Sequence, residues 1–131
     1  ILLKVASGEY KTLSIFGKDW PTHDGTCIRD FIHIVDLAEA HIAALKYIID
    51  SPPTLRSLNI GTGRGHSVLE VVETFKKVNK CEFKYFFKPR REGDAASLVA
   101  DNTLALSTLN WSPKRSLKDM CRDAWRWKLN N

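Results

Sequence analysis

Apolar and polar residues follow one another along the chain in a pattern that predicts short strands, each leading into a helix. Residues 13–16 form a short apolar run typical of a strand, and residues 31–35 are rich in β-branched and aromatic side chains. Directly afterwards, Asp36 and Glu39 have the spacing of a capping box, which predicts a helix through about Ile49. This helix has only a narrow polar stripe, so we expect it to pack against partners on more than one side.

The second half of the chain repeats this order of strand and helix. Ser67 and Glu70 have the spacing of a second capping box, and the apolar spacing that follows predicts a helix ending near Lys80. The other predicted elements are strands at residues 57–60 and 83–88, a short helix at 100–109 opened by Asp101, and a last amphipathic helix beginning at Ser116. Because strands and helices alternate, the sequence predicts an α/β fold.

The composition is that of a folded domain. The chain has 131 residues, of which 44% are hydrophobic and 27% are charged, which predicts a single domain with a core of its own. No apolar run reaches the length of a membrane helix, so we expect a soluble cytoplasmic protein. The 3 cysteines lack the spacing of metal ligands, so we expect reduced thiols and no metal site. A net charge of +5 suits anionic ligands without identifying one.

The start of the chain suggests a truncation. The first residue is not Met, and the apolar residues at positions 1, 2, 5 and 6 have the spacing of the end of an amphipathic helix that stops at Gly8. We therefore expect a fragment of a longer protein.

Residues 61–65 carry a glycine-rich motif. Gly61, Gly63 and Gly65 lie between a predicted strand and a predicted helix, where a dinucleotide-binding loop would lie. His66 takes the place of the third glycine of such a loop, so a tight turn leading into the helix is the simpler interpretation.

Two other stretches, residues 29–30 and 89–94, place arginines beside carboxylates. A guanidinium group matches phosphate oxygens, and a carboxylate can accept hydrogen bonds from ribose hydroxyls. The same residues can equally form a solvated charge cluster or structural ion pairs. His33 and His41 lie on apolar elements, where we expect structural roles in the core.

Residues 25–38, with the run Gly-Thr-Cys-Ile-Arg-Asp-Phe-Ile-His-Ile-Val-Asp-Leu-Ala, closely resemble the C-terminal part of the UDP-glucose 4-epimerase family, within the extended short-chain dehydrogenase/reductases. Residues 13–17, 59–63, 89–94 and 109–111 follow in the order of that family and at roughly its spacing. The resemblance covers nearly the whole chain and implies the substrate-binding part of such an enzyme, without its N-terminal Rossmann half. The intact family interconverts UDP-glucose and UDP-galactose with NAD as cofactor.

By this resemblance, the residues that bind the substrate are retained. Arg29 and Arg91 would contact the pyrophosphate, and Asp94 would contact the ribose hydroxyls. The backbone of Ser14, Ile15 and Phe16 would contact the edge of the uracil. Leu98 stands where many members have a tyrosine near the sugar pocket, so the choice of hexose stays open, with UDP-N-acetylglucosamine as one possibility.

The catalytic and cofactor-binding motifs of the family are absent from this sequence. It has no G-x-x-G-x-x-G loop, and the residues four positions after Tyr10, Tyr47 and Tyr85 are Ser14, Ser51 and Pro89 rather than lysine. We therefore expect no catalytic residue in this chain, no binding of NAD by it alone, and no activity alone. By the resemblance, residues 31–50 pack on the missing cofactor domain, so we expect their apolar surface to drive self-association.

Other functions remain alternatives at this point. The chain could belong to a related epimerase or dehydratase that acts on UDP-glucuronate, UDP-arabinose or a dTDP-sugar, or it could be a stand-alone nucleotide-sugar-binding module. We expect no nucleic-acid partner, because the basic residues are dispersed and the tryptophans form no stacking platform among them.

Overall fold

The computed structural model describes residues 1–53 and 55–131. Its elements, in chain order, are α1 (Leu2–Ala6), β1 (Thr12–Phe16), β2 (Ile28–Asp30), α2 (Ile34–Asp50), β3 (Gly65–Ser67), α3 (Val68–Asn79), β4 (Lys84–Lys88), β5 (Ser97–Leu98), α4 (Thr103–Leu109) and α5 (Leu117–Leu129). Strands and helices alternate along most of this order, which confirms the α/β prediction. None of the helices among the described residues has the length and apolar character needed to span a bilayer.

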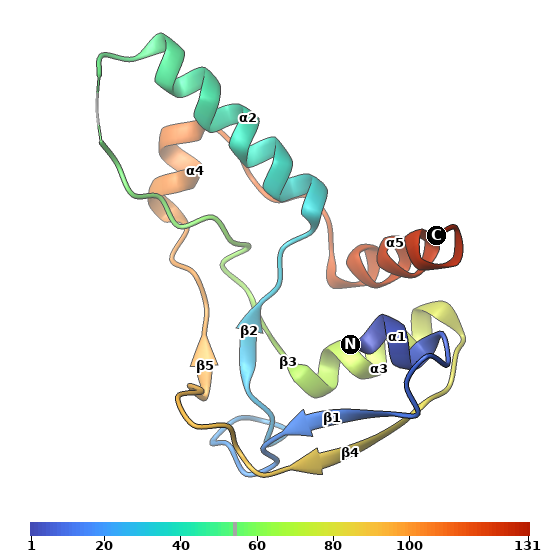
Figure 1. Ribbon diagram of the computed structural model, residues 1–131. Helices are drawn as coiled ribbons and strands as arrows, with labels where there is room; N and C mark the ends of the chain where they lie inside the picture. The colour runs from blue at the N-terminus through green and yellow to red at the C-terminus, as the bar shows by residue number, and fades with distance from the viewer. Residues whose placement is uncertain (54) are drawn as a thin grey trace.

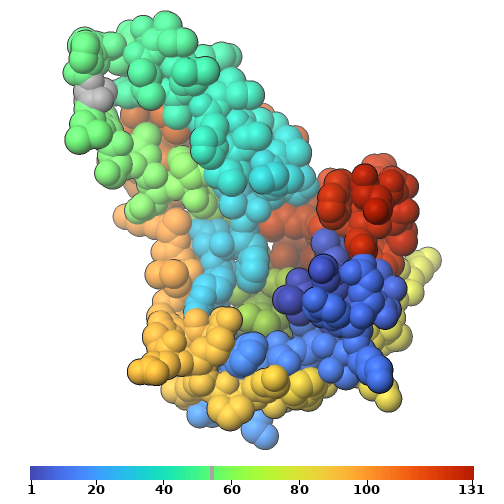
Figure 2. All heavy atoms as spheres, viewed as in Figure 1, coloured from blue at the N-terminus to red at the C-terminus, as the bar shows by residue number. Residues whose placement is uncertain are grey.

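The elements form two helical regions joined by a narrow middle (Figure 1). At one end α1, α3 and α5 lie beside the parallel pair β1 and β4, and at the other end α2 packs with α4. The middle consists of β3, β2 and β5 in that spatial order, with β2 antiparallel to β3 and parallel to β5. The space-filling view shows α2 reaching out from the rest of the molecule at the upper end (Figure 2).

Separate apolar clusters stabilise the two ends. Val5 and Leu13 pack with Ile15 and Val72 between β1 and the helices, and Phe75, Leu117 and Cys121 join α3 to α5. At the other end Ala40 of α2 packs with Leu109 and Trp111. The middle strands therefore lie between two cores, where polar residues reach solvent.

Local capping explains the helices that the sequence predicted well. The Ser67 hydroxyl accepts a hydrogen bond from the Glu70 amide at 2.9 Å, and the Glu70 carboxylate reaches back to the Ser67 amide, which confirms the capping box of α3. This helix ends at Asn79, and the next residue, Lys80, has a left-handed conformation. The predicted start at Ser116 is confirmed by a capping box of the same kind.

The predicted strand at residues 31–35 is wrong. The strand in this region is β2, which ends at Asp30, and α2 already begins at Ile34. The N-cap is the His33 ring, whose Nδ1 accepts a hydrogen bond from the Val35 amide at 3.1 Å. Asp36 therefore lies inside the first turn of α2, where its buried carboxylate binds the Arg115 amide and guanidinium instead of capping the helix.

Three smaller predictions also need correction. Residues 57–60 form no strand, since Leu58 and Ile60 pack against α2 as extended chain without a strand partner among the described residues. The short helix α4 begins at Thr103 rather than at residue 100 and has Asn102 as N-cap, while Asp101 Oδ1 accepts a hydrogen bond from the Thr103 amide at 3.1 Å. His33 is buried as expected, whereas His41 is exposed on α2.

Candidate functional site

The residues singled out from the sequence come together where the β1–β4 pair meets β2 and β5 (Figure 1). Phe16, the last residue of β1, pairs with Lys88, the last residue of β4, so both strands end at the same place. The chain then runs from β4 through residues 89–96 to β5, which pairs with β2 through Arg29 and Leu98. The tertiary structure thus brings residues 12–16 and 28–30 beside residues 84–98, which follow more than fifty positions later in the sequence.

Asp94 lies between two guanidinium groups. Its Oδ2 accepts a hydrogen bond from Arg91 Nε at 2.9 Å, and its Oδ1 lies 3.5 Å from an Arg29 terminal nitrogen. Arg29 is also held by its own donation to the Ala95 carbonyl oxygen at 2.9 Å. Two cations therefore share one carboxylate, which leaves a net positive charge suited to an anionic ligand.

An aromatic ring forms the other side of this cluster. The Arg91 guanidinium lies 4.8 Å from the centroid of the Phe16 ring, and the Lys88 ammonium lies 5.9 Å from the same centroid. Cations beside an aromatic face are attracted to its π electrons. Arg91 is thus oriented by Asp94 and by Phe16 together, while 59% of its side chain stays exposed to solvent.

The remaining predicted site residues differ in how far their side chains are exposed to a ligand. The Ile15 side chain is buried in the core, so this residue can bind a ligand only through its backbone. Ser14 is half-buried on the same strand. Leu98 is 65% exposed and lines a groove of about 500 Å³ together with Arg29, Asp30 and the chain at residues 58–61. A ligand part beyond the charged cluster can therefore extend toward Leu98.

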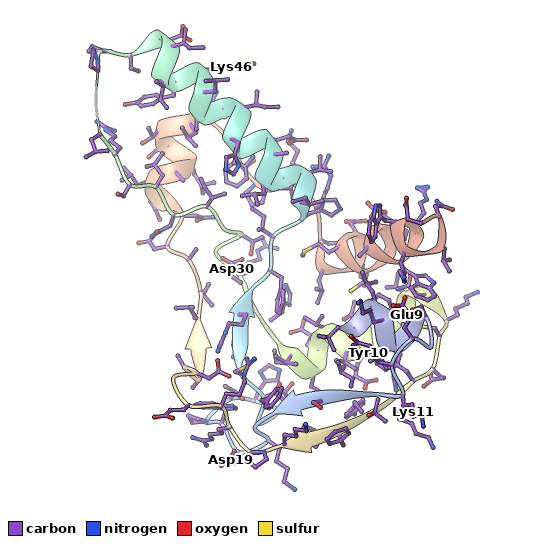
Figure 3. All side chains as sticks on the ribbon, in the orientation of Figure 1. Glu9, Tyr10, Lys11, Asp19, Asp30 and Lys46 are labelled. Carbon is purple, nitrogen blue, oxygen red and sulfur yellow. The ribbon has the colours of Figure 1, made fainter. Side chains whose placement is uncertain are left out.

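The glycine-rich motif is a structural turn. The Asp30 carboxylate accepts hydrogen bonds from the Thr62 and Gly63 amides, each at 2.9 Å. Figure 3 shows Asp30 near the end of β2 that faces this turn. A Cβ added at Gly61 would collide with the same carboxylate, so the turn requires glycine here. Because Asp30 already occupies these amides, they are not available to bind a phosphate.

A second and larger cavity, of about 810 Å³, lies away from this cluster. It is lined by polar residues of the 62–66 turn, of α3 and of residues 112–118. It contains none of Arg29, Arg91 and Asp94, so cavity size alone does not identify the site.

Sequence reasoning missed the neighbours that orient the cluster. Lys88 lies beside Phe16, and Arg90 contacts both Asp19 and Trp20. These contacts join residues about seventy positions apart, as the separation of 71 between Arg90 and Asp19 shows, and no local spacing signals them.

Comparisons with known proteins identify the family. Residues 2–124 match the family described as GDP-mannose 4,6 dehydratase. A UDP-glucose 4-epimerase of Bacillus subtilis is 48% identical over 128 residues, which are 98% of this chain and 38% of that protein. One of Drosophila melanogaster is 45% identical over 131 residues, covering 99% of this chain and 37% of that protein.

Solved structures that resemble this chain are also named UDP-glucose 4-epimerases. The chain matches the UDP-glucose 4-epimerase of Stenotrophomonas maltophila, described with NAD and formylated UDP-arabinopyranose, with a TM-score of 0.94, 43% identity and coverage of 98% of this chain and 38% of that one. The enzyme of Bifidobacterium longum, in complex with NAD+ and UDP, matches with a TM-score of 0.93 and 39% identity, over 99% of this chain and 38% of that one.

The chain thus spans about 38% of the length of the relatives that it matches. It belongs to the family described as GDP-mannose 4,6 dehydratase, among the extended short-chain dehydrogenase/reductases, and it corresponds to a C-terminal portion of these proteins.

Proposed function

We propose that this chain is the UDP-sugar-binding, C-terminal portion of an NAD-dependent UDP-glucose 4-epimerase, which interconverts UDP-glucose and UDP-galactose in its intact form. The observation that carries the proposal is the convergence of Arg29 and Arg91 on Asp94 beside Phe16. This cluster lies in a chain whose relatives are named UDP-glucose 4-epimerases. A site of two cations, one carboxylate and one aromatic ring matches the groups of a nucleoside diphosphate.

In this proposal each residue has one role. Arg29 and Arg91 bind the pyrophosphate, and Asp94 accepts hydrogen bonds from the ribose hydroxyls. The backbone of Ser14–Phe16 contacts the uracil edge, and the hexose lies toward Leu98. Charge-assisted hydrogen bonds would hold the nucleotide firmly while the sugar stays free to turn, as an exchange of configuration at one sugar carbon requires.

The glycine turn at residues 61–65 does not offer free amides to a dinucleotide. The glycine turn, which is the motif nearest to a dinucleotide loop, uses its Thr62 and Gly63 amides to bind Asp30. We therefore propose that NAD binds to a part of the enzyme outside this chain, and that the chain alone binds none. The apolar outer side of α2 is then the surface on which that part packs. The free thiols fit a cytoplasmic location.

Isothermal titration of the chain with UDP tests this proposal. Arg91→Ala should weaken UDP binding by about 10-fold or more, because it removes a charge-assisted phosphate contact worth roughly 1.5–3 kcal/mol. Arg126→Ala, an exposed arginine of α5, is the matched control and should leave the affinity unchanged. Equal affinity of both variants would remove Arg91 from the site, and tighter binding of dTDP than of UDP would contradict the choice of nucleotide.

A further inference from the structure

Two adjacent arginines in the site face different partners. Arg91 points toward Asp94 and Phe16, as described above. Arg90 instead donates a hydrogen bond from Nε to Asp19 Oδ1 at 2.9 Å, and one of its terminal nitrogens donates to the Asp19 carbonyl oxygen. This hydrogen bond lowers the pKa of the Asp19 carboxyl below its usual value. The Arg90 guanidinium is thus bound to Asp19, which belongs to the loop at residues 17–25 (Asp19 is labelled in Figure 3).

The same guanidinium also stacks on Trp20. Its central carbon lies 4.1 Å from the centroid of the indole ring, which is a close cation–π contact. The indole in turn donates a hydrogen bond from Nε1 to the Phe16 carbonyl oxygen at 3.4 Å. Arg90 is therefore connected, through Trp20, to the residue on which Arg91 rests.

The backbone leaves this arrangement little freedom. Gly17 follows Phe16 with a φ of 82°, and its amide donates to the Lys88 carbonyl oxygen at 2.8 Å. A Cβ at Gly17 would collide with the Trp20 indole and crowd the Arg90 side chain. The loop thus closes tightly over the ends of β1 and β4, and Arg90 fastens it there.

These contacts are local rather than central to the core. The Arg90 side chain is 40% exposed and that of Asp19 is 69% exposed, and exposed ion pairs contribute little to overall stability. Removing Arg90 should therefore make the loop and Phe16 less ordered without lowering the stability of the fold.

We infer that Arg90 is a positioning residue, which latches the 17–25 loop through Asp19 and Trp20 and so holds Phe16 and Arg91 in the geometry that binds the nucleotide. The inference rests on the proposed UDP site. It gives the two arginines different roles: Arg91 contacts the ligand, and Arg90 acts through Arg91.

A double-mutant cycle tests this division. UDP affinity is measured for the unaltered chain, Arg90→Ala, Arg91→Ala and the double variant. Because contacts that act as one unit are not additive, Arg90→Ala should weaken binding about 5–10-fold when Arg91 is present and less than about 2-fold when it is absent. Arg90→Lys should weaken binding about as much as Arg90→Ala, because lysine keeps the charge but lacks the planar fork. Arg126→Ala is the control for loss of an exposed arginine.

Additive losses in the cycle would show that Arg90 acts independently of Arg91, and full rescue by Arg90→Lys would show that the charge of Arg90 suffices without its planar fork. Either result would overturn the inference. A second readout needs no ligand. Trypsin should cleave after the exposed Lys18 several-fold faster in Arg90→Ala than in the unaltered chain, with no change in the midpoint of thermal unfolding.

If the unaltered chain binds no UDP, the proposed function fails separately. Faster cleavage at Lys18 would then still support the latch, and unchanged cleavage would overturn it.

Discussion

Asp94 shows how one side chain can organise a charged site. Its carboxylate is only 20% exposed and accepts hydrogen bonds from Arg91, while Arg29 lies close on the other side. Arg29 has independent support from the Ile28 and Ala95 carbonyl oxygens. The two arginines can therefore keep their approximate positions when Asp94 loses its charge.

Asp94→Asn should separate the ribose contact from the phosphate contacts. We expect UDP binding to weaken about 10-fold, because the variant has a weaker acceptor for the ribose hydroxyls. Inorganic pyrophosphate, which has no ribose, should bind equally well or more tightly, because the arginines are no longer neutralised. Calorimetry with both ligands measures this, with Glu92→Gln, an exposed neighbour, as control. An equal loss for UDP and pyrophosphate would argue against the ribose role.

Asp36 is the buried acid that connects α2 to the chain before α5. It accepts hydrogen bonds from the Lys114 amide at 3.2 Å and the Arg115 amide at 2.9 Å, and it pairs with the Arg115 guanidinium. Burial by itself raises the pKa of Asp36, but the hydrogen bonds from Arg115 and Lys114 outweigh it, so the pKa lies below its usual value.

The stability of the fold should therefore depend on Asp36 at low pH. A carboxyl whose folded-state pKa is depressed stabilises the fold above its unfolded pKa of about 3.9, and this stabilisation is lost as pH falls through the folded-state pKa. Asp36→Asn should cost roughly 2–4 kcal/mol at neutral pH. The midpoint temperature of unfolding should also fall less in the Asp36→Asn variant than in the unaltered chain between about pH 5 and about pH 3.

Thermal unfolding followed by circular dichroism at several pH values measures both effects. Asp50→Asn, at the exposed end of α2, is the control. If the unfolding midpoint falls equally with decreasing pH in the Asp36→Asn variant and in the unaltered chain, the ionisation of Asp36 is not linked to stability.

At the scale of elements, α2 exposes an apolar stripe. Its outward side chains recur every three or four residues, the spacing of one helix face. They include Ile34, Ile42, Leu45 and Ile49, whose exposed fractions are 71%, 56%, 59% and 72%. The opposite side of the helix, with Ala40, packs on the core. A stripe of this size is typical of a surface that another protein segment covers.

We predict that the chain self-associates through this stripe. Replacing Ile42 and Leu45 by lysine should shift the chain toward the monomer in size-exclusion chromatography and lower the binding of a hydrophobic dye. Leu104→Lys is a matched control, because Leu104 is 54% exposed but lies on α4. Strictly monomeric elution of the unaltered chain at micromolar concentration, without dye binding, would contradict the prediction.

At the scale of the whole molecule, the site lies at a junction. The β1–β4 pair belongs to the end with α1, α3 and α5, whereas β2 and β5 lead to the end with α2 and α4 (Figure 1). Arg91 and Phe16 come from the first side, and Arg29 comes from the second. The site therefore needs both ends in their observed arrangement.

The chain by itself should not catalyse epimerisation. It has no tyrosine with a lysine four positions later, and its glycine turn is closed by Asp30. Incubation with UDP-galactose and NAD should therefore produce no UDP-glucose by chromatography, even where calorimetry detects UDP binding. Product formed by the purified chain, absent from a mock purification, would mean that these residues include catalytic groups that we have not identified.

Local signals explain which parts of the fold could be predicted. The capping box at Ser67 and Glu70 uses side chains three residues apart, and the start at Ser116 does the same with Asp119, so both helices were placed correctly. Residues 31–35 and 57–60 have strand-like composition, but a strand also needs a neighbour. The strands that pair with β2 are residues 65–67 and 97–98. They lie far from β2 in the sequence, so no local pattern indicates the pairing.

The site divides in the same way. The sequence by itself determined the α/β class and the starts of α3 and α5, and motifs that resemble a family predicted Arg29, Arg91 and Asp94 as site residues. Only the tertiary structure decided that Asp30 closes the glycine turn and that Arg90 fastens the loop beside Phe16. The reason is range: capping and periodicity depend on residues a few positions apart, whereas these contacts join side chains that only folding brings within hydrogen-bonding distance.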